Sequence, residues 1–271
     1  MLIIMKHGIK ITLMLIILFF LTQIIGLAIT NFYLEKDLPY GIERPQVNQE
    51  KPVQSASFIF LIILIATVII IFFAKFNMAF LWKIWFFLAV VFTLSISFST
   101  MLSQIFSVIL AIILAFFKVV KRNIVIHNIT ELFIYGAMAA IFAPVLNVTI
   151  MIILLAAISM YDMFSVWITK SMVNLAKFQT KLRLFAGLLI PYKNNIAVLG
   201  GGDIGFPLLF AGVLLRDYGF RSIVISICAT IALSILLYKS EKKKYYPAMP
   251  FITIGCLIGY FILILFKYFY I

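Results

Sequence analysis

The stretch Leu155-Ala156-Ala157-Ile158-Ser159-Met160-Tyr161-Asp162 is an apolar run that ends on an acid. A second such run, Val198-Leu199-Gly200-Gly201-Gly202-Asp203-Ile204, follows later in the chain. The whole sequence has only nine acidic residues, so two of them within apolar runs are conspicuous. A charged side chain in membrane hydrocarbon costs roughly 2.5–3.5 kcal/mol on insertion scales, and it normally faces a bundle interior and marks a functional site. Asp162 and Asp203 are therefore the first candidates for chemistry.

The composition of the chain indicates a membrane protein. Of its 271 residues, 65% are hydrophobic and 11% are charged, whereas soluble domains are about 45–50% apolar. We predict an all-α polytopic membrane protein with a single domain over residues 1–271. The formal net charge is +13, but the Lys and Arg residues are scattered between apolar runs. This pattern is typical of topology signals and contacts with membrane lipid, and we expect no nucleic-acid partner.

Nine apolar runs are candidates for transmembrane helices, which need about 20 residues to cross about 30 Å of hydrocarbon. They occupy roughly residues 9–30, 57–74, 78–97, 99–117, 130–146, 148–168, 196–215, 221–238 and 247–266. Six helices thus lie within about 9–168 and three within about 196–266. The links at 97–100 and 144–147 are each compatible with a turn or with a kink in one long helix. Pro144 and Asn147 favour a turn at the second link.

The distribution of basic residues predicts the orientation. With nine spans, the side that holds the N-terminus carries 16 Lys and Arg residues, and the opposite side carries 6. Cytoplasmic loops are enriched in Lys and Arg, so the N-terminus is expected in the cytoplasm. The connection over 169–195 mixes apolar residues with Lys177, Lys181 and Arg183. We expect it to lie in the lipid headgroup region.

Asp162 and Asp203 can meet at one level of the membrane. Asp162 precedes Lys170 by eight residues, and Asp203 follows Lys193 by ten, which at about 1.5 Å per helical residue places each carboxyl ~12–15 Å from its cation. Helices that are consecutive in the sequence commonly pack as neighbours. Two close carboxylates cannot both ionise cheaply, so one keeps a proton while the other activates water. Such a pair supplies the acid and the base of aspartic-protease chemistry.

Two further motifs accompany the acids. Gly200-Gly201-Gly202 directly precedes Asp203, and each glycine costs a helix about 1 kcal/mol relative to alanine. The run predicts an irregular backbone beside a water-accessible cavity, with tight packing through small residues as the alternative. Pro247-Ala248-Met249-Pro250 opens the ninth span. By itself it indicates a proline-rich helix start.

The motifs Tyr161-Asp162, Gly200-Gly201-Gly202-Asp203 and Pro247-Ala248-Met249-Pro250, in that order on three late spans, resemble those of the presenilin and signal peptide peptidase family of intramembrane aspartyl proteases. The run that begins at Tyr161 resembles the archaeal members. The resemblance implies a nine-helix, presenilin-like bundle with a presenilin-like orientation, in the cell membrane of a prokaryote. It implies that Asp162 and Asp203 are catalytic. The implied active-site neighbours are Tyr161, Gly200, Gly201, Gly202, Pro247, Ala248, Met249 and Pro250.

One position departs from the family pattern. The family usually has Pro-Ala-Leu at the ninth helix, whereas this chain has Met249 in place of the leucine. Leucine and methionine are similar in volume and polarity, so we expect little loss of packing.

Other catalytic chemistries find no support in the sequence. His7 and His127 are the only histidines and are predicted near the membrane surfaces. A Ser-His dyad at membrane depth and a His-Glu-x-x-His zinc helix are therefore excluded, and we expect no metal or cofactor. We interpret His127 as an interfacial polar residue. Cys228 and Cys256 fall in apolar runs, where cysteine behaves as a small hydrophobe.

Two functions from different classes fit the acidic pair. The favoured one is an endopeptidase that hydrolyses peptide bonds within transmembrane helices. Its expected partners are these transmembrane substrates. Because a helix hides its carbonyls in hydrogen bonds, such a substrate must unwind locally, and it can then pair by strand addition with residues 170–195 and Gly200–Gly202. The rival is a proton- or cation-coupled transporter that binds its ion at the same pair. Carriers often have related halves, and the first half has no counterpart of Gly200–Asp203.

Overall fold

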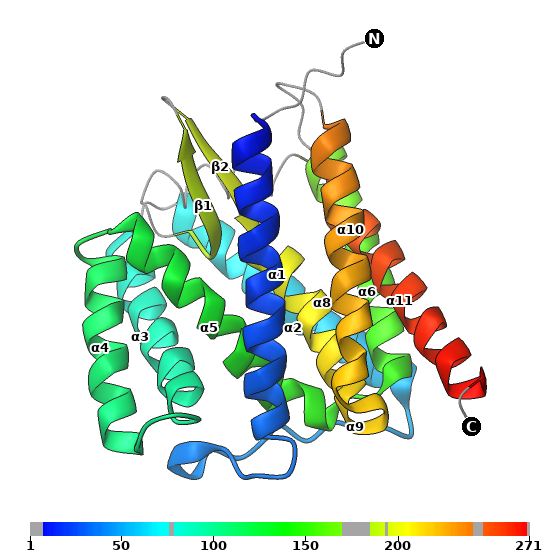
Figure 1. The fold of residues 1–271 in the computed structure, drawn as a ribbon. Helices are drawn as coiled ribbons and strands as arrows, with labels where there is room; N and C mark the ends of the chain where they lie inside the picture. Colours follow the sequence, from blue (N-terminus) through cyan, green and yellow to red (C-terminus); the bar gives the residue numbers. More distant parts are fainter. Residues whose placement is uncertain (1–7, 76–78, 170–184, 193–194, 241–245, 270–271) are drawn as a thin grey trace.

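The structure, a computed structural model, describes residues 8–75, 79–169, 185–192, 195–240 and 246–269. Nine principal helices and one β-hairpin make up this part of the chain (Figure 1). The helices are α1 (Ile9–Phe32), α2 (Pro52–Lys75), α3 (Ala79–Phe98), α4 (Gln104–Val119), α5 (Ile124–Phe142), α6 (Val148–Met163), α8 (Gly201–Val213), α10 (Ile223–Lys239) and α11 (Met249–Phe269). The shorter elements are the 3-10 turns η1 (Pro39–Gly41), η2 (Ala143–Val145) and η4 (Gly219–Ser222), the π-helical turn η3 (Phe164–Ile168), the short helix α9 (Leu215–Tyr218), and the strands β1 (Gly187–Tyr192) and β2 (Asn195–Gly200).

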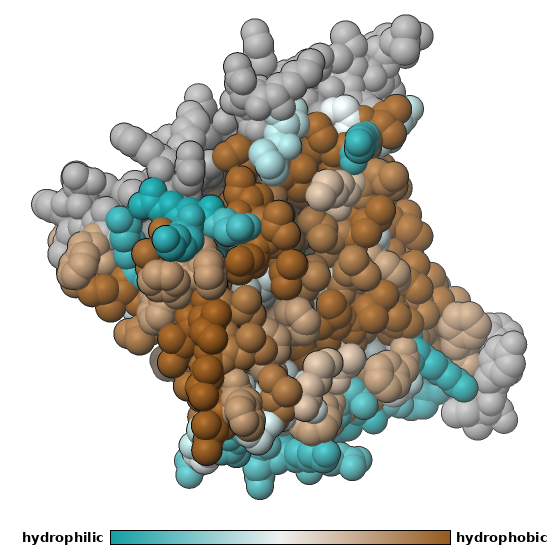
Figure 2. All heavy atoms as spheres, turned by 60° about the vertical axis from the view of Figure 1, so that its left-hand side comes forward, coloured by the Kyte–Doolittle hydropathy of each residue, from teal (hydrophilic) through white to brown (hydrophobic). Residues whose placement is uncertain are grey.

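The outer surface of the bundle is a hydrocarbon-facing surface. Within the described residues, seven helical segments are long and apolar enough to cross a membrane, and they include α1, α2, α3, α5, α6, α10 and α11. Figure 2 shows a broad hydrophobic belt between two hydrophilic ends. Large apolar side chains on this belt, such as Phe58 and Val68, are about two-thirds exposed. Because continuous apolar surface of this size is unfavourable in water, the belt fits an integral, multi-pass membrane protein.

Helix α8 lies inside the bundle, where it contacts α1, α5, α6, α10 and α11. Between Ile204 and Val213 every side chain except Phe206 is buried, so the helix is apolar all round. A helix surrounded by other helices can be short, because it does not have to match the thickness of the lipid. At 13 residues α8 is shorter than its neighbours α1 and α10. The fold thus encloses α8 from Ile204 onward, while its first turn, with Asp203, is partly exposed.

Two glycines bring α11 close to α10. Gly255 and Gly259 are four residues apart, the spacing that lets membrane helices approach closely. A Cβ on Gly255 would lie 2.7 Å from the carbonyl oxygen of Cys228, and one on Gly259 would lie 2.7 Å from the Cα of Ile225. These contacts fix the direction of α11 and hence the position of its first residue, Met249.

The helix boundaries confirm one predicted turn and correct another boundary. The link after α5 is a turn: Asn147 caps α6 by accepting a hydrogen bond from the Ile150 N–H at 2.8 Å. Helix α3 ends at Phe98 and α4 begins at Gln104, so that link is also a turn. The fifth helix begins at residue 124 and not at 130. Its N-cap is Asn123, which accepts from the backbone N–H groups of the first turn, and N-cap asparagine fixes a helix start more firmly than hydropathy indicates.

The prediction for residues 196–215 is corrected at its start. Residues 196–200 lie in strand β2, which pairs with β1 in an antiparallel hairpin, and the helix begins only at Gly201. The expected headgroup connection over 169–195 lies largely outside the described residues, but 187–192 forms strand β1. Pairing two apolar strands satisfies backbone groups that would otherwise be buried without partners. The predicted helix over 196–215 is therefore a strand over its first quarter.

Candidate active site

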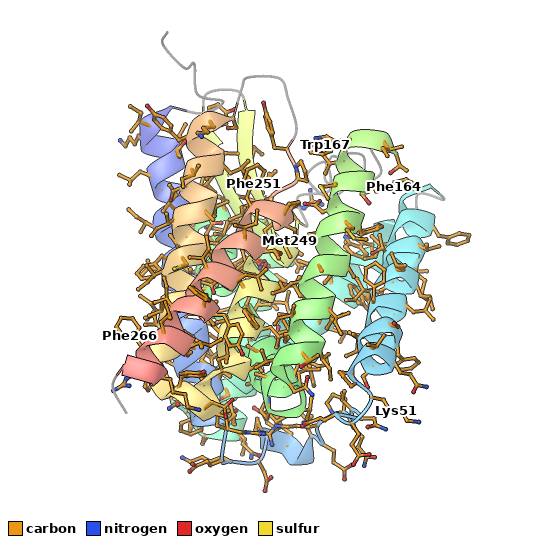
Figure 3. All side chains as sticks on the ribbon, turned by 90° about the vertical axis from the view of Figure 1, so that its right-hand side faces the viewer. Lys51, Phe164, Trp167, Met249, Phe251 and Phe266 are labelled. Carbon is orange, nitrogen blue, oxygen red and sulfur yellow. The ribbon has the colours of Figure 1, made fainter. Side chains whose placement is uncertain are left out.

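Asp162 lies near the end of α6 and faces the start of α11. Its Oδ2 accepts a hydrogen bond from the backbone N–H of Met249 at 3.2 Å, and the N–H of Ala248 is a second donor. The N–H groups at a helix start have no partners in the helix and carry partial positive charge, so they stabilise an acidic group. In Figure 3, Met249 lies beside α6, and Phe164 and Trp167 lie towards the end of that helix. The α11 motif therefore contacts Asp162 through its backbone.

A second contact fastens α6 to α11 one turn away from Asp162. The hydroxyls of Ser159 and Thr253 lie 2.8 Å apart and are buried. Directly after α6 the backbone widens into the π-helical turn η3, a rare form that is frequent at functional sites. Asp162 thus lies between a fixed helix–helix contact and a change in helix geometry.

Asp203 lies in the first turn of α8. Gly200 is the N-cap of this helix, and the Asp203 carboxyl returns to accept a hydrogen bond from the Gly200 N–H. This is the arrangement in which an acidic or amide side chain at the third helical position satisfies the N–H of the cap. Strand β2 ends at the same Gly200. The hairpin therefore leads directly into the segment that carries Asp203.

The structure brings the two acids together. The carboxyl of Asp162 lies within electrostatic range of Asp203, although one is on α6 and the other on α8. Both side chains are only half-buried. Two carboxylates in this relation favour one shared proton, since like charges at close range repel strongly where water is scarce. The arrangement can hold an acid and a base within range of each other's charge.

The three glycines before Asp203 have different surroundings. A Cβ on Gly201 would lie 2.7 Å from the Tyr135 hydroxyl oxygen and 3.1 Å from the carbonyl oxygen of Ala186. A Cβ on Gly200 would lie 3.1 Å from Asp203 Oδ2. Gly202 is exposed, and the nearest atom to a Cβ there is in Phe206 at 3.8 Å. Close packing therefore explains Gly201, whereas Gly202 leaves open backbone beside Asp203.

The remaining predicted neighbours of the two acids are packed against other parts of the protein. The ring of Tyr161 packs edge-on against Phe60 of α2, with the ring centroids 6.3 Å apart. Pro247 is buried ahead of α11, and Pro250 is the second residue of that helix. The side chain of Met249 is 3% exposed. The α11 motif is packed into the protein, and its contact with Asp162 comes from backbone N–H groups.

Helix α5 holds the hairpin at the outer edge of β1. The Asn128 side chain donates to the carbonyl of Leu189 at 2.7 Å and accepts from its N–H at 3.0 Å. His127 Nε2 lies 2.8 Å from the carbonyl oxygen of Gly187. His127, predicted as an interfacial polar residue, is 4% exposed, and its side chain ties α5 to the strand. The pair Asn128 and His127 was not recognised in the sequence, since only the fold places it beside a strand.

The outer edge of β2, in contrast, has no partner strand among the residues that the structure describes. Since the backbone groups of Leu189 point away from β2, those of its register partner Val198 point away from β1. The same alternation applies to Ile196, opposite Pro191. The described residues give these outward N–H and C=O groups no partner. The side chains of Ile196 and Val198 are 39% and 38% exposed, so the edge is accessible.

A third intramembrane acid was missed. Glu131, on α5, is 1% exposed, so Asp162 and Asp203 are not the only acids within the helices. No group of three or more His, Cys, Asp and Glu side chains that could hold a metal occurs in the described ranges. Both cysteines are free thiols there, as expected for small hydrophobes.

Comparison with known proteins identifies a family and a similar fold. Residues 16–204 match the family model described as signal-peptide peptidase, presenilin aspartyl protease. Two solved structures of a presenilin family intramembrane aspartate protease, in the C222 and P2 space groups, superpose with TM-scores of 0.65 and 0.64 at 17% sequence identity. They cover 93% and 92% of this chain and 97% and 95% of theirs, and so support the fold. Comparison with curated proteins gave no match.

Proposed function

The chain belongs to the signal-peptide peptidase and presenilin family of aspartyl proteases, and from this premise we propose that Asp162 and Asp203 are its catalytic pair. The enzyme is an intramembrane aspartic endopeptidase. The observation that carries the assignment is that the two acids, from α6 and α8, lie within electrostatic range of each other while each faces the start of a helix. Family membership gives no support to the transporter alternative.

The proposed reaction uses the pair as a combined acid and base. The ionised carboxylate takes a proton from water as the water oxygen bonds to the scissile carbonyl carbon, and the protonated carboxyl donates to the carbonyl oxygen. The tetrahedral intermediate then collapses as the amide nitrogen gains a proton. The C–N bond breaks, and a carboxylic acid and an amine are released. Donors already aligned on Asp162 limit its reorganisation during the reaction.

The substrates we propose are transmembrane helices that unwind near the site. An unwound segment exposes backbone groups, which are costly in a membrane unless they are paired. The open edge of β2 offers the outward N–H and C=O groups of Ile196 and Val198, and β2 leads straight to Gly200 and Asp203. A substrate that adds to this edge as a third strand would present its backbone to the acids. The β1 edge is closed by Asn128, so addition is directed to β2.

Substitution of each acid tests the assignment. Asp162→Asn and Asp203→Asn keep the side-chain size but remove the carboxylate, and each is expected to lower cleavage of a single-span reporter by about a hundredfold or more. The measurement uses purified protein in proteoliposomes. Asp217→Asn is the matched control, because Asp217 is an exposed acid on α9. Wild-type cleavage by either dyad variant would refute the assignment, and ion flux without hydrolysis would favour the transporter.

A further inference from the structure

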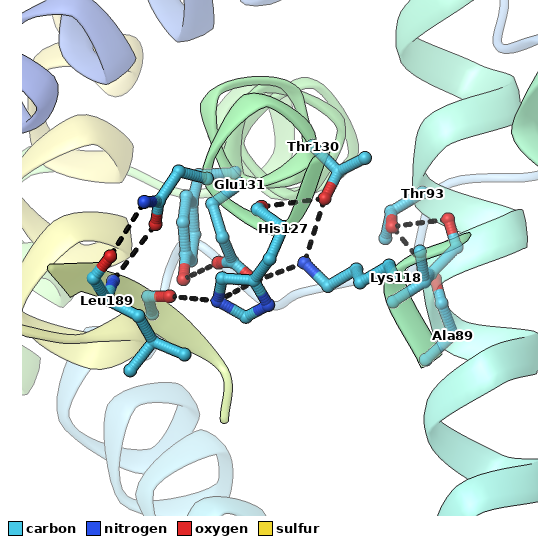
Figure 4. Close-up of polar contacts among 11 residues, drawn as sticks. Ala89, Thr93, Lys118, His127, Thr130, Glu131 and Leu189 are labelled. Atoms are coloured by element: carbon cyan, nitrogen blue, oxygen red, sulfur yellow. Dashed lines mark hydrogen bonds and ion pairs between the residues drawn. The ribbon is translucent and has the colours of Figure 1, made fainter. Parts of the chain in front are cut away.

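A buried ion pair joins α4 to α5 at a distance from both proposed catalytic acids in the sequence. Lys118 Nζ lies 2.5 Å from Glu131 Oε1, and the two side chains are 0% and 1% exposed (Figure 4). Burying two charges costs several kcal/mol for each ion, and loss of one partner leaves the other uncompensated. Ionisable groups within a membrane protein are accordingly uncommon and mark functional positions. This pair has no part in the proposed reaction.

The hydrogen bonds around Glu131 connect the pair to Tyr135. Lys118 also donates to Thr130 Oγ1 at 3.0 Å, and Thr130 donates to the His127 carbonyl at 2.8 Å. The second carboxylate oxygen of Glu131 accepts a hydrogen bond from the Tyr135 hydroxyl, one helical turn further along α5. Hydrogen bonds to a charged acceptor are roughly twice as strong as neutral ones. The hydroxyl of Tyr135 is therefore held by Glu131, which Lys118 in turn holds from α4.

Tyr135 in turn contacts the start of α8. Its hydroxyl oxygen is the closest atom, at 2.7 Å, to where a Cβ on Gly201 would lie, and its ring continues along the helix to Gly205. The side chain is 6% exposed and lies within electrostatic range of Asp203. Gly201 is the first residue of α8, two residues before Asp203. The position of the Tyr135 hydroxyl thus sets how closely the beginning of α8 can approach α5.

We propose that Tyr135 is a positioning residue for Asp203, and that the ion pair of Glu131 and Lys118 holds the Tyr135 hydroxyl in place. The inference rests on the proposed function of Asp203. Because Tyr135 contacts Gly201 and His127 contacts Gly187, helix α5 supports both the helix start and the strand beside it. Asp203 must lie within a fraction of an ångström of its working position, since misplacement by about 1 Å can cost a hundredfold in rate. The ion pair fixes the position of Asp203 through Tyr135 and Gly201, without touching the reacting groups.

The first experiment removes the Tyr135 hydroxyl. Tyr135→Phe in full-length, reconstituted protein is expected to lower kcat for a single-span reporter by about tenfold, with KM changed less than about twofold, because substrate contacts are untouched. Tyr33→Phe is the matched control: Tyr33 is 2% exposed and donates to the Ile96 carbonyl at 2.9 Å, away from α8. Both variants lose one buried hydrogen bond. Equal kcat for the two variants would overturn the proposal.

The second experiment tests the contact itself through a double-mutant cycle. Gly201→Ala is expected to lower both thermal stability and kcat in the wild-type background, and to lower both less in Tyr135→Phe, where the closest opposing atom is gone. Additive effects in both measurements would overturn the proposal. The thermal-stability measurements do not depend on catalysis. They therefore test the Tyr135–Gly201 contact separately from the proposed catalytic role of Asp203. Cleavage that survives in Asp203→Asn would refute the proposed function while leaving the Tyr135–Gly201 contact measurable.

Discussion

At the scale of single residues, the site separates side chains that act by chemistry from those that act by position. Three successive glycines look equivalent in the sequence, yet Gly200 lies against the Asp203 carboxyl, Gly201 packs most tightly, against Tyr135, and Gly202 is open. A glycine is required where a side chain would collide, and elsewhere it destabilises the helix relative to alanine. The open backbone at Gly202 is therefore best explained by a substrate that approaches Asp203 at this point.

A Gly202→Ala substitution separates folding from catalysis. The variant is expected to unfold at the same temperature as wild type or slightly higher, because alanine favours a helix by up to about 1 kcal/mol and the nearest atom is 3.8 Å away. Its cleavage of the reporter is expected to fall severalfold, since the methyl group occupies the approach to Asp203. Thermal unfolding and kcat/KM check the two parts. A lower unfolding temperature would show that Gly202 is a packing glycine after all.

Single residues also show where sequence reasoning ends. Asp162, Asp203 and the α11 motif were identified from their order along the chain, and the structure brings the two acids into range of each other. Lys118 was counted among the topology charges because it ends an apolar run, and Glu131 stood near a predicted helix boundary. Their partnership depends on how α4 packs on α5. No local pattern encodes it, because the two residues lie on different helices.

At the scale of elements, the hairpin is the feature that hydropathy could not reveal. The residues of β2 are as apolar as those of the α8 run that follows, so the sequence favoured one continuous helix over 196–215. A strand is stabilised by a partner elsewhere in the chain, whereas a helix satisfies its own backbone. Pro191, on the outer side of β1, fits an edge position, where no N–H is needed for the ladder.

The open edge of β2 gives an element-scale prediction. Val198→Pro removes one outward N–H but none of the bonds to β1, so the hairpin is expected to persist while cleavage of the reporter falls by about tenfold, consistent with the loss of roughly one hydrogen bond. Leu199→Pro is the contrasting variant, because the backbone N–H of Leu199 points to β1. Its loss removes a bond between the strands and should unfold the hairpin. Circular dichroism and reporter cleavage distinguish them. Unchanged cleavage by Val198→Pro would exclude strand addition at this edge.

The packing of α11 on α10 gives a second prediction of this kind. Gly259→Ala places a methyl group 2.7 Å from the Cα of Ile225, and overpacking of this sort costs roughly 1–3 kcal/mol. The variant is expected to unfold at a lower temperature and to lose activity, because the start of α11 shifts away from Asp162. Gly8→Ala is the control, since nothing lies within 4 Å of a Cβ there. A wild-type unfolding temperature would mean that α10 and α11 are not packed this closely.

At the scale of the whole molecule, apolar runs and turn residues predicted most of the bundle. The nine principal helices of the described part correspond to the nine predicted spans, since length and hydropathy identify the long helices that face lipid and α4 and α8 are shorter apolar runs. The burial of α8 could not be predicted, because an apolar run does not show whether lipid or protein surrounds it. The orientation in the membrane remains a prediction from charge alone.

Orientation can be measured by labelling. The start of α1 and the end of α10 lie together at one end of the molecule, and α9 lies at the other (Figure 1). In a Cys228→Ala, Cys256→Ala background, a cysteine in place of Lys239 is expected to resist a membrane-impermeant maleimide in intact cells, whereas one in place of Asp217 should react. Inverted vesicles should give the opposite pattern. Labelling of both or of the reverse set in intact cells would contradict the charge-based orientation.

The backbone contact between α11 and Asp162 also bears on how the molecule is made. Residues near position 249 leave the ribosome long after position 162 has been inserted, so a nascent chain that ends before α11 lacks the donors for that acid. A chain truncated before α11 is therefore expected to leave the Asp162 carboxyl without these backbone donors.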